Sequence, residues 1–396
     1  MDRIIFHIDV NNAFLSWTAV YLLKQGEKID IRTIPSIIAG DEKQRRGIVL
    51  AKSPVAKKYG IKTAETIYSA KKKCPGLKVY PPSYEMYKIE SEKMYKYLCQ
   101  YTPVIQRYSI DECFIDLTGT NFIYKDYIEL AYKIKEDIKR KFGFTVNIGI
   151  GNNRLCAKMA SDFEKPDRVH TLYNNEIKEK MWPLPIEDLF MVGNKTAEKM
   201  KMLNINKIGD LANMDIEILK RHFKNQAQFY KEYALGIDNS KVEQPKEVTD
   251  SISMTETLPY DYKNKKNLQS VLLHQTNELT KELREKKQFV QTVGIIYKNN
   301  KFEKYTHQTK LEIPLNNAEE IYEVVLTLFN RSWKEDAIRN IGIRFSELTK
   351  TKTEQMSLFA MEKKEERNDI QEVIDKINKK YNTNALTIAS MRDRDK

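Results

Sequence analysis

The stretch Tyr108–Asp116, which reads YSIDECFID, places two adjacent acids, Asp111 and Glu112, among apolar residues that favour β-strands. Neighbouring side chains on a strand point to opposite faces, so both acids can serve one site only where the backbone turns or bulges. Their repulsion is relieved by protonation or by a cation. Magnesium suits carboxylate oxygens, but acidic pairs are also common in surface hairpins. The pair alone leaves both interpretations open.

Another candidate acid follows the first apolar run of the chain. Residues 4–8 (IIFHI) predict a buried strand, and this strand ends at Asp9. A helix is expected next, over residues 13–23, and Asp9 could simply mark the turn before it. Together with Asp111 and Glu112, however, Asp9 makes the minimal carboxylate set for two magnesium ions in phosphoryl transfer.

The sequences of Asp9–Phe14 (DVNNAF) and Ser109–Glu112 (SIDE) resemble the signature of the Y-family, or translesion, DNA polymerases. The resemblance runs from the first strand to the end of the chain in the family's order. It implies an α+β right-hand polymerase fold and low-fidelity, template-directed addition of dNTPs to a primer 3′-hydroxyl opposite damaged DNA. It also implies two bound Mg²⁺ ions, for which Mn²⁺ can substitute. The implied metal ligands are Asp9, the carbonyl of Val10, Asp111 and Glu112.

A chain of 396 residues is long enough for two to four domains with separate cores. By the resemblance we expect the catalytic palm in residues 1–23 and 81–166, the fingers in 24–80, a helical thumb in 167–235, a linker in 236–247, the little finger in 248–348 and a tail in 349–396. The strand and helix patterns of the little-finger segment also predict a β-α-β-β-α-β order.

The net charge of +12 suits a polyanionic partner, although plain cytosolic proteins can be equally basic. Much of the positive charge is concentrated in one segment: residues 41–80 hold eleven Lys and Arg but only three acids. In this segment a short helix is expected to open at Pro54, just after Ser53, and to stop at Gly60. The helix start and Lys57 are candidate ligands for the triphosphate of the incoming nucleotide. The alternative is a solvated basic helix.

Further positions follow from the resemblance. Phe14 matches the steric gate, an aromatic ring that packs on the sugar and excludes a 2′-hydroxyl, and Lys165 matches the family's triphosphate lysine. Otherwise Phe14 would be a core residue and Lys165 a surface residue. The chain departs from the family pattern at Ala13, usually aromatic, and at Pro54 and Lys57, where many members have tyrosine and arginine. The last two departures favour the UmuC-like over the polymerase IV-like bacterial branch.

Residues 188–199 (DLFMVGNKTAEK) resemble a helix-hairpin-helix, whose backbone amides bind DNA phosphate without reading sequence. Gly193 and Lys195 are the expected DNA contacts. Met191 replaces the usual first glycine, and we expect this to weaken the contact. Simple packing of two helices is the alternative. Farther along, Lys298 is a candidate DNA contact within a local cluster of lysines.

The segment Gln355–Phe359 resembles the motif that binds the bacterial sliding clamp, normally Gln-Leu-Ser/Asp-Leu-Phe. The implied clamp-binding residues are Gln355, Met356, Ser357, Leu358 and Phe359. Alternatively, the apolar side chains of this segment dock on the protein's own domain. Residues 366–389 then predict an amphipathic helix and a short strand, an extension that again favours the UmuC-like branch.

The four cysteines lie far apart without paired spacing, which argues against a zinc site or a disulfide framework and fits a reducing cytoplasm. No apolar run reaches the length of a membrane span. We therefore expect a soluble, cytoplasmic, monomeric enzyme that acts on primer–template DNA and dNTPs without contacting a membrane. Two other functions stay open: a metal-dependent nuclease or nucleotide cyclase, and a non-catalytic DNA-binding repair scaffold.

Overall fold

A computed structural model describes residues 3–41, 47–243, 250–350 and 380. The described residues fall into two compact units, one that contains residues 3–40 and 47–243 and one that contains residues 250–350. The clamp-like segment Gln355–Phe359 and, apart from Lys380, the predicted extension over 366–389 lie outside the described residues. None of the described helices combines the length and hydropathy that a membrane crossing requires.

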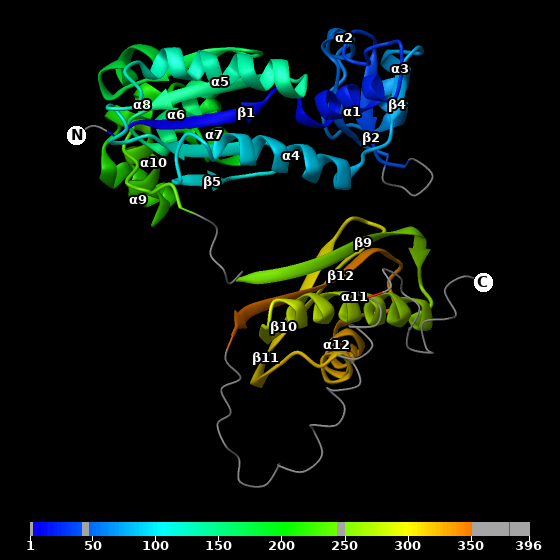
Figure 1. Ribbon diagram of the computed structural model, residues 1–396. Coiled ribbons are helices and arrows are strands. Elements are labelled where there is room, and N and C mark those ends of the chain that lie inside the picture. The colour runs from blue at the N-terminus through cyan, green and yellow to red at the C-terminus, as the bar shows by residue number, and fades with distance from the viewer. Residues whose placement is uncertain (1–2, 42–46, 244–249, 351–379, 381–396) are drawn as a thin grey trace. The chain divides into compact units, whose positions relative to one another are not determined.

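A five-stranded sheet with the strand order β5–β6–β1–β7–β8 forms the centre of the first unit (Figure 1). Its strands are β1 (Ile5–Val10), β5 (Ile105–Arg107), β6 (Glu112–Asp116), β7 (Val146–Gly151) and β8 (Val169–Leu172). The fully buried β1 pairs antiparallel with both β6 and β7, which places Asp9 opposite Glu112 on one side and opposite Asn147 on the other.

Strand β8 corrects the prediction that helical structure begins at residue 167. It pairs in parallel with β7 at the edge of the sheet, so the sheet extends into the segment that was assigned to the thumb. The strand spans four residues and is mostly half-buried. Such a short strand leaves no periodic pattern in the sequence, and its pairing partner decides its structure.

The two faces of this sheet have different roles because side chains alternate along each strand. Phe6, Ile8 and Val10 of β1 face a core built with apolar side chains of three helices. These helices are α1 (Ala13–Lys24), α4 (Tyr84–Leu98) and α5 (Tyr127–Phe142). Asp9 therefore lies on the opposite face, where α6 (Arg154–Asp162) packs against the sheet.

Helix α6 approaches the sheet closely because two residues of β7 have no side chain. A Cβ atom on Gly149 would overlap the carbonyl oxygen of Ala157, and one on Gly151 would lie 2.7 Å from the Ala157 nitrogen. Only glycine permits such an approach of helix backbone to strand. The close packing brings Lys158 and Ser161 of α6 to the face of β1 that carries the acid.

A small basic module inserts between α1 and α4. It consists of β2 (Ser36–Ala39), β3 (Val49–Lys52), α2 (Pro54–Lys58), α3 (Ile67–Lys73) and β4 (Lys78–Tyr80), with the sheet order β3–β2–β4. Asn12, at a left-handed φ of 51°, donates its side-chain amide to the Lys52 carbonyl at 2.7 Å. This hydrogen bond ties the module to the end of the strand that carries Asp9.

Helices form the rest of the first unit. They are α7 (Asn194–Lys201), α8 (Ile208–Asn213), α9 (Ile216–Phe223) and α10 (Gln226–Ala234), preceded by short turns at Asn174–Glu176, Ile177–Met181 and Ile186–Asp188. Their core includes Leu155, Cys156 and Met159 of α6. Helix α6 is thus shared, with the sheet on one side and this helical layer on the other.

The second unit has the predicted β-α-β-β-α-β order, which is confirmed. Its elements are β9 (Ser251–Tyr262), α11 (Lys265–Glu285), β10 (Phe289–Asn299), β11 (Lys304–Leu315), α12 (Ala318–Ser332) and β12 (Ile338–Thr349). The strands form an antiparallel sheet in the order β11–β10–β12–β9. The two helices lie side by side against this sheet (Figure 1), and Leu272 and Phe329 join strand residues such as Val293 in one core.

Candidate active site

Asp9 and Glu112 form the centre of a charged cluster. They are direct partners across β1 and β6. Lys158 Nζ lies 3.3 Å from Glu112 Oε1 and 3.8 Å from Asp9 Oδ2. The Lys165 ammonium binds the same Asp9 carboxylate and lies 2.7 Å from Asp162 Oδ1. Two lysines therefore balance acids whose charged form burial would otherwise disfavour.

The acids of this cluster respond differently to burial. Burial raises the pKa of Asp9, and the ammonium groups of Lys165 and Lys158 only partly oppose it. Burial also acts to raise the pKa of Glu112, but the hydrogen bond from His7 and the charge of Lys158 outweigh it and lower this pKa to about 2. Glu112 is therefore ionised at any physiological pH. The charge of Asp9 depends more strongly on the cations around it.

Asp111 lies in the bend of the hairpin, one residue before β6. Its carbonyl accepts a hydrogen bond from Val10 N at 3.1 Å, and its carboxylate Oδ1 accepts one from Ser109 Oγ at 2.6 Å. The bend interrupts the strand alternation between Asp111 and Glu112, as the sequence required. The carboxylate of Asp111 is engaged with Ser109, whereas Lys158 links Asp9 with Glu112.

No three His, Cys, Asp or Glu side chains of the described residues converge closely enough to enclose a metal ion as they stand. The donor chemistry nevertheless fits a hard divalent cation, because carboxylates are its preferred ligands. Asp9 and Glu112 face each other and already bind cationic ammonium groups, and Asp111 is one residue away. These three acids are the residues that could hold a metal.

Phe14 is the second residue of α1 and is half-buried. Its ring stacks on buried Tyr87 at 4.6 Å and 13°, and it meets Tyr84 edge-on at 6.0 Å. The stacking on Tyr87 fixes the orientation of the Phe14 ring, and Phe14 lies only a few residues after Asp9 in the chain. Tyr84, which is 52% exposed, is an aromatic neighbour that the sequence reading did not single out.

Ser53 is the N-cap of α2, and Lys57 lies in the last turn of this short helix. The Ser53 hydroxyl is buried; it accepts from Ala56 N at 2.9 Å and donates to the Ile34 carbonyl at 2.7 Å. Ser53 is thus placed as a structural N-cap, and its hydroxyl is not directed at a ligand. Lys57 is exposed. The burial of Lys52 lowers the pKa of Lys52, and the charge of Lys57 lowers it further. Lys57 and Lys52 are therefore neighbouring cations.

The helix-hairpin-helix segment contains a strained residue. Met191 has a φ of 71°, in the left-handed region where an L side chain costs roughly 1–2 kcal/mol. This conformation explains why glycine suits the position that Met191 occupies. Gly193, with a φ of −80°, is the N-cap of α7, and Lys195 is exposed on the first turn of that helix.

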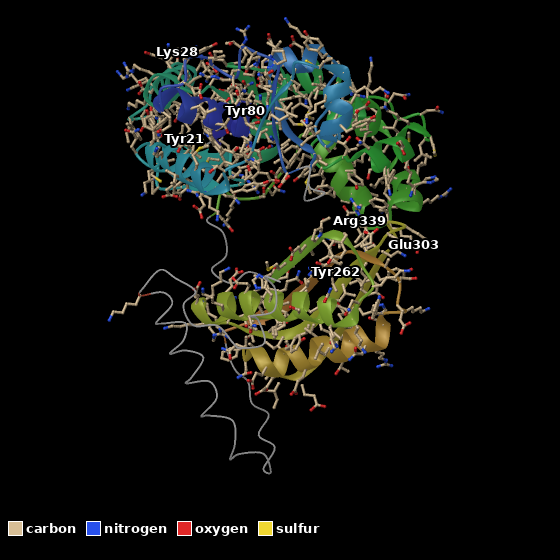
Figure 2. All side chains as sticks on the ribbon, turned by 90° about the vertical axis from the view of Figure 1, so that its right-hand side faces the viewer. Tyr21, Lys28, Tyr80, Tyr262, Glu303 and Arg339 are labelled. Carbon is tan, nitrogen blue, oxygen red and sulfur yellow. The ribbon has the colours of Figure 1, made fainter. Side chains whose placement is uncertain are left out.

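In the second unit, Lys298 lies beside an exposed aromatic residue. Lys298 Nζ is 6.0 Å and Arg339 Cζ is 4.9 Å from the ring centroid of Phe302. Figure 2 labels Arg339 and Glu303, which follows Phe302 in the chain. Both contacts are within the range of cation–π attraction. Arg339 is thus a second cation at the place where the sequence identified Lys298.

Three residues of this cluster were missed in the sequence: His7 and Lys158, which contact the acids, and Ser161, which contacts His7. His7 Nε2 lies 3.2 Å from Glu112 Oε2, and His7 Nδ1 lies 2.8 Å from Ser161 Oγ. A weak signal was present, because His7 is two strand residues before Asp9 and therefore on the same face. Lys158 and Ser161 share a helix face through their spacing of three, but only the close packing of α6 brings them to the site.

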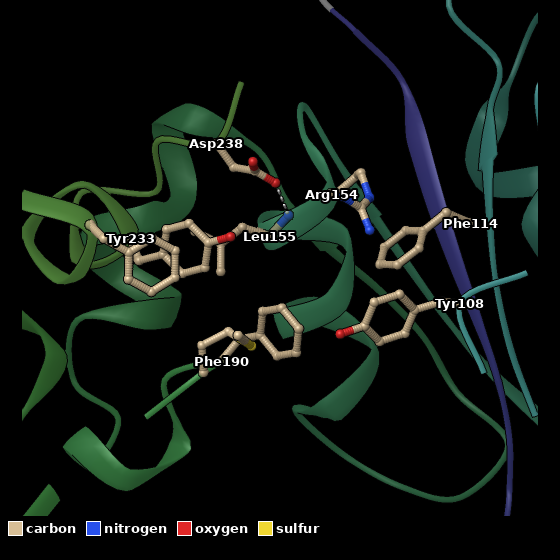
Figure 3. Close-up of a pocket in the computed structure, with 9 residues that line it drawn as sticks. Tyr108, Phe114, Arg154, Leu155, Phe190, Tyr233 and Asp238 are labelled. Carbon is tan, nitrogen blue, oxygen red and sulfur yellow. Dashed lines mark hydrogen bonds between the residues drawn. The ribbon is translucent and has the colours of Figure 1, made fainter. Parts of the chain in front are cut away.

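A pocket adjoins this network on the side of the helical layer (Figure 3). Tyr108 and Phe114 of the hairpin form one wall, and Phe190 and Tyr233, whose rings are nearly parallel, form another. The Arg154 guanidinium lies 4.8 Å from the Phe114 ring centroid. The Tyr108 amide donates to the Glu112 carbonyl at 2.9 Å, so the pocket and the acidic strand share one hairpin.

Comparison with known proteins identifies the family. Residues 8–162 match the impB/mucB/samB family, residues 249–358 match its C-terminal domain, and residues 174–205 match the IMS family HHH motif. The chain is 44% identical to DNA polymerase IV of Clostridium acetobutylicum over 98% of this chain and 97% of that protein. The chain belongs to the impB/mucB/samB family. It is also 32% identical to DNA polymerase IV of Oceanobacillus iheyensis, over 97% of this chain and 91% of that protein.

This impB/mucB/samB protein has the fold of a solved Y-family DNA polymerase chimera, with a TM-score of 0.76 over 88% of this chain and 100% of that one, at 21% identity. The Y-family resemblance and the predicted right-hand fold, with its helix-hairpin-helix and C-terminal little finger, are confirmed. The names of the relatives favour the polymerase IV-like branch over the UmuC-like branch that Pro54, Lys57 and the C-terminal extension had favoured.

Proposed function

We propose that this protein is a template-directed, low-fidelity DNA polymerase that adds dNTPs to a primer 3′-hydroxyl opposite damaged bases. The observation that carries the proposal is the 44% identity with a DNA polymerase IV along nearly the full length of both chains. The pairing of Asp9 with Glu112 on the central strands supplies matching chemistry. A nuclease, a nucleotide cyclase or a non-catalytic scaffold would not account for this full-length relationship.

The proposed division of the chain keeps the boundaries expected from the sequence, with one change. The palm comprises residues 1–23 and 81–166 and gains β8 from the following segment. The fingers are residues 24–80, the thumb is the remainder of 167–235, the linker is 236–247, the little finger is 248–348, and residues 349–396 form the tail.

Asp9, Asp111 and Glu112, together with the carbonyl of Val10, are the proposed ligands of two Mg²⁺ ions, and Mn²⁺ can substitute. When bound, such ions lower the pKa of the primer hydroxyl and neutralise charge on the departing pyrophosphate. The permanent negative charge of Glu112 supports this role, since its pKa is about 2. The contact of Lys165 with Asp9 places its ammonium next to these acids, where it can bind the triphosphate.

The substrate contacts follow from the same assignment. Phe14, held by Tyr87, is the proposed steric gate. Lys57 and Lys165 are the proposed side-chain contacts to the triphosphate. Ser53 caps the start of α2 and so holds the backbone of that helix start in place. In this view the buried hydroxyl of Ser53 acts through the backbone that it fixes.

DNA and partner contacts are the remaining part of the proposal. Gly193 and Lys195 at the start of α7 would bind phosphates of the duplex, and Lys298 would do so from the second unit. Gln355–Phe359 would bind the bacterial sliding clamp. We further propose a cytoplasmic monomer, which agrees with the four free cysteines of the chain.

Primer extension on a defined template tests the proposal. Wild-type protein should lengthen the primer only when template, divalent cation and the complementary dNTP are all present. Asp111→Ala and Glu112→Ala should abolish extension and leave primer–template binding nearly unchanged, because DNA affinity comes mainly from phosphate contacts. Asp116→Asn is the matched control, since Asp116 lies on the same strand but contacts Arg3 instead.

Two results would count against the proposal. Primer shortening or cyclic nucleotide formation in place of extension would support a nuclease or a cyclase. Extension by both alanine variants at more than a few per cent of the wild-type rate would remove these acids from the catalytic site.

A further inference from the structure

His7 and Ser161 connect Glu112 to helix α6. Both side chains are completely buried, and His7 Nε2 lies 3.2 Å from Glu112 Oε2 while His7 Nδ1 lies 2.8 Å from Ser161 Oγ. The three side chains form a continuous hydrogen-bonded chain across α6, β1 and β6. One end of this chain is a proposed metal ligand, and the other end is anchored in a helix.

The donors and acceptors along this chain determine where the protons lie. An ionised Glu112 can only accept, so His7 Nε2 must carry the hydrogen that points to it. A neutral imidazole then offers Nδ1 as an acceptor, and the hydroxyl of Ser161 supplies the donor. This hydroxyl also lies 2.7 Å from the Lys158 carbonyl, so its proton can turn between two acceptors.

We propose that His7 and Ser161 are positioning residues that hold Oε2 of Glu112 in place and leave Oε1, beside Lys158, for a metal ion. This inference rests on the proposed function, in which Glu112 is a metal ligand. Partners that orient a metal ligand typically change metal affinity by roughly 10- to 100-fold when they are removed. Comparable losses are expected here, because no other described side chain donates to Oε2 of Glu112.

A purely structural role would not require a histidine at this position. The His7 ring lies 4.6 Å from the Phe114 ring, and the neighbouring residues Ile5 and Ala157 belong to an apolar cluster with Phe114. A phenylalanine could fill the same space without burying two polar nitrogen atoms, which is costly unless both are hydrogen-bonded. The polar ring is therefore explained by the carboxylate that it holds.

Manganese binding without turnover tests the inference. The full chain is mixed with a dideoxy-terminated primer–template, the next dNTP and Mn²⁺, and free Mn²⁺ is followed by electron paramagnetic resonance. His7→Phe should weaken Mn²⁺ binding by roughly 10- to 100-fold, and Ser161→Ala should weaken it less. His7→Gln should recover part of the affinity because its amide N–H can reach the carboxylate. His170→Phe is the matched control, since the buried Nε2 of His170 on β8 has no hydrogen-bond partner within the part of the chain that the structure describes.

The outcomes separate this inference from the proposed function. Glu112→Gln is titrated in parallel, and its failure to weaken Mn²⁺ binding would refute the ligand assignment itself. If Glu112→Gln weakens binding but His7→Phe stays within about twofold of wild type, the positioning role alone is wrong. Melting temperatures identify any variant that does not fold. Should His7→Phe not fold, unchanged affinity in Ser161→Ala would overturn the inference in the same way.

Discussion

The ammonium group of Lys158 lies 3.3 Å from Oε1 of Glu112, so a permanent cation is already placed against a candidate catalytic acid. Lys158 is only 10% exposed in its side chain, and it also lies 3.3 Å from Asp162. Burial lowers the pKa of Lys158, but these carboxylates outweigh it and raise the pKa above its ordinary value. The charge is therefore fixed, and its removal should be visible.

Replacing Lys158 with methionine should destabilise the metal-free protein by roughly 3 kcal/mol, because it removes the ammonium beside Glu112 and leaves Asp9 with Lys165 alone. Added Mg²⁺ should restore much of this loss, and the variant should gain more melting temperature from Mg²⁺ than wild type gains. Thermal unfolding in EDTA and in Mg²⁺ measures both effects. Lys139→Met is the control, because Lys139 is half exposed and pairs with Asp167 instead. Equal Mg²⁺ responses in Lys158→Met and wild type would contradict the expectation.

Phe14→Ala should raise ribonucleotide incorporation relative to deoxyribonucleotide incorporation by roughly tenfold or more, since a lost steric contact of this size is worth about 1–3 kcal/mol. Single-nucleotide insertion with matched dNTP and NTP measures the ratio. Phe142→Ala is the matched control, as Phe142 is also half-buried and stacks on an aromatic neighbour, Phe144. An unchanged ratio in Phe14→Ala would make Phe14 a core residue only.

Asp167 should make stability depend on pH. Burial acts to raise its pKa, but hydrogen bonds from Lys135 and Lys139 outweigh it and hold the pKa below the ordinary value of 3.8. A lowered pKa stabilises the fold above pH 3.8, and this contribution is lost as pH falls through the folded-state pKa.

Asp167→Asn isolates this contribution, because asparagine tolerates the left-handed φ of 62° at this position. The substitution should cost about 1.5–3 kcal/mol at pH 7, the range for hydrogen bonds to charged groups. Urea unfolding at a series of pH values should show the difference from wild type shrinking below pH 3.8. A difference that stays constant with pH would mean that the ion pairs contribute nothing.

Met191→Gly should stabilise the fold by about 0.5–1 kcal/mol, since the relief of left-handed strain exceeds the added entropy of the unfolded chain. The freed backbone should also strengthen binding to duplex DNA. Met202→Gly is the contrasting control: Met202 is more exposed, at 83%, but has an ordinary φ of −62°, so glycine there should destabilise. If both variants shift the urea midpoint in the same direction, strain at Met191 is not the cause.

Replacing Leu358 and Phe359 with alanine should reduce sliding-clamp affinity by two or more orders of magnitude. We expect each side chain to bury apolar surface on the clamp worth about 1.5–3 kcal/mol. We expect the tether to act at roughly millimolar effective concentration. Surface plasmon resonance on immobilised clamp measures the affinity. Extension of a short primer without clamp should stay normal in the same variant. Its loss would indicate that the segment docks on its own protein.

The sequence predicted the parts of the site that depend on local pattern. A buried strand that ends in Asp9, and an acidic pair inside an apolar hairpin, can be recognised because strand burial and turn formation act over a few residues. The order of elements in the second unit was predictable for the same reason, since its helices and strands are long and regular.

The parts that depend on tertiary approach could not be predicted from pattern. The contact of Ser161 with His7 exists only because α6 lies directly on β7; the glycines of β7 permit this approach, but the sequence does not show which helix makes it. Strand β8 depends in the same way on its neighbour. The sequence also did not show that the Ser53 hydroxyl caps α2 inside the fold; phosphate binding at this helix start stays a prediction.

Because Gly149 has no side chain, α6 can lie directly on β7. This strand position therefore determines where the charged groups of α6 lie, although it does not contact them. A single methyl group there would press on the Ala157 carbonyl and lift α6 from the sheet. The helix would take Lys158 and Ser161 with it, so Glu112 would lose its lysine and the anchor of its His7 partner, and Asp9 would lose one of its two lysines. A position with no functional group of its own is therefore needed to bring these groups together.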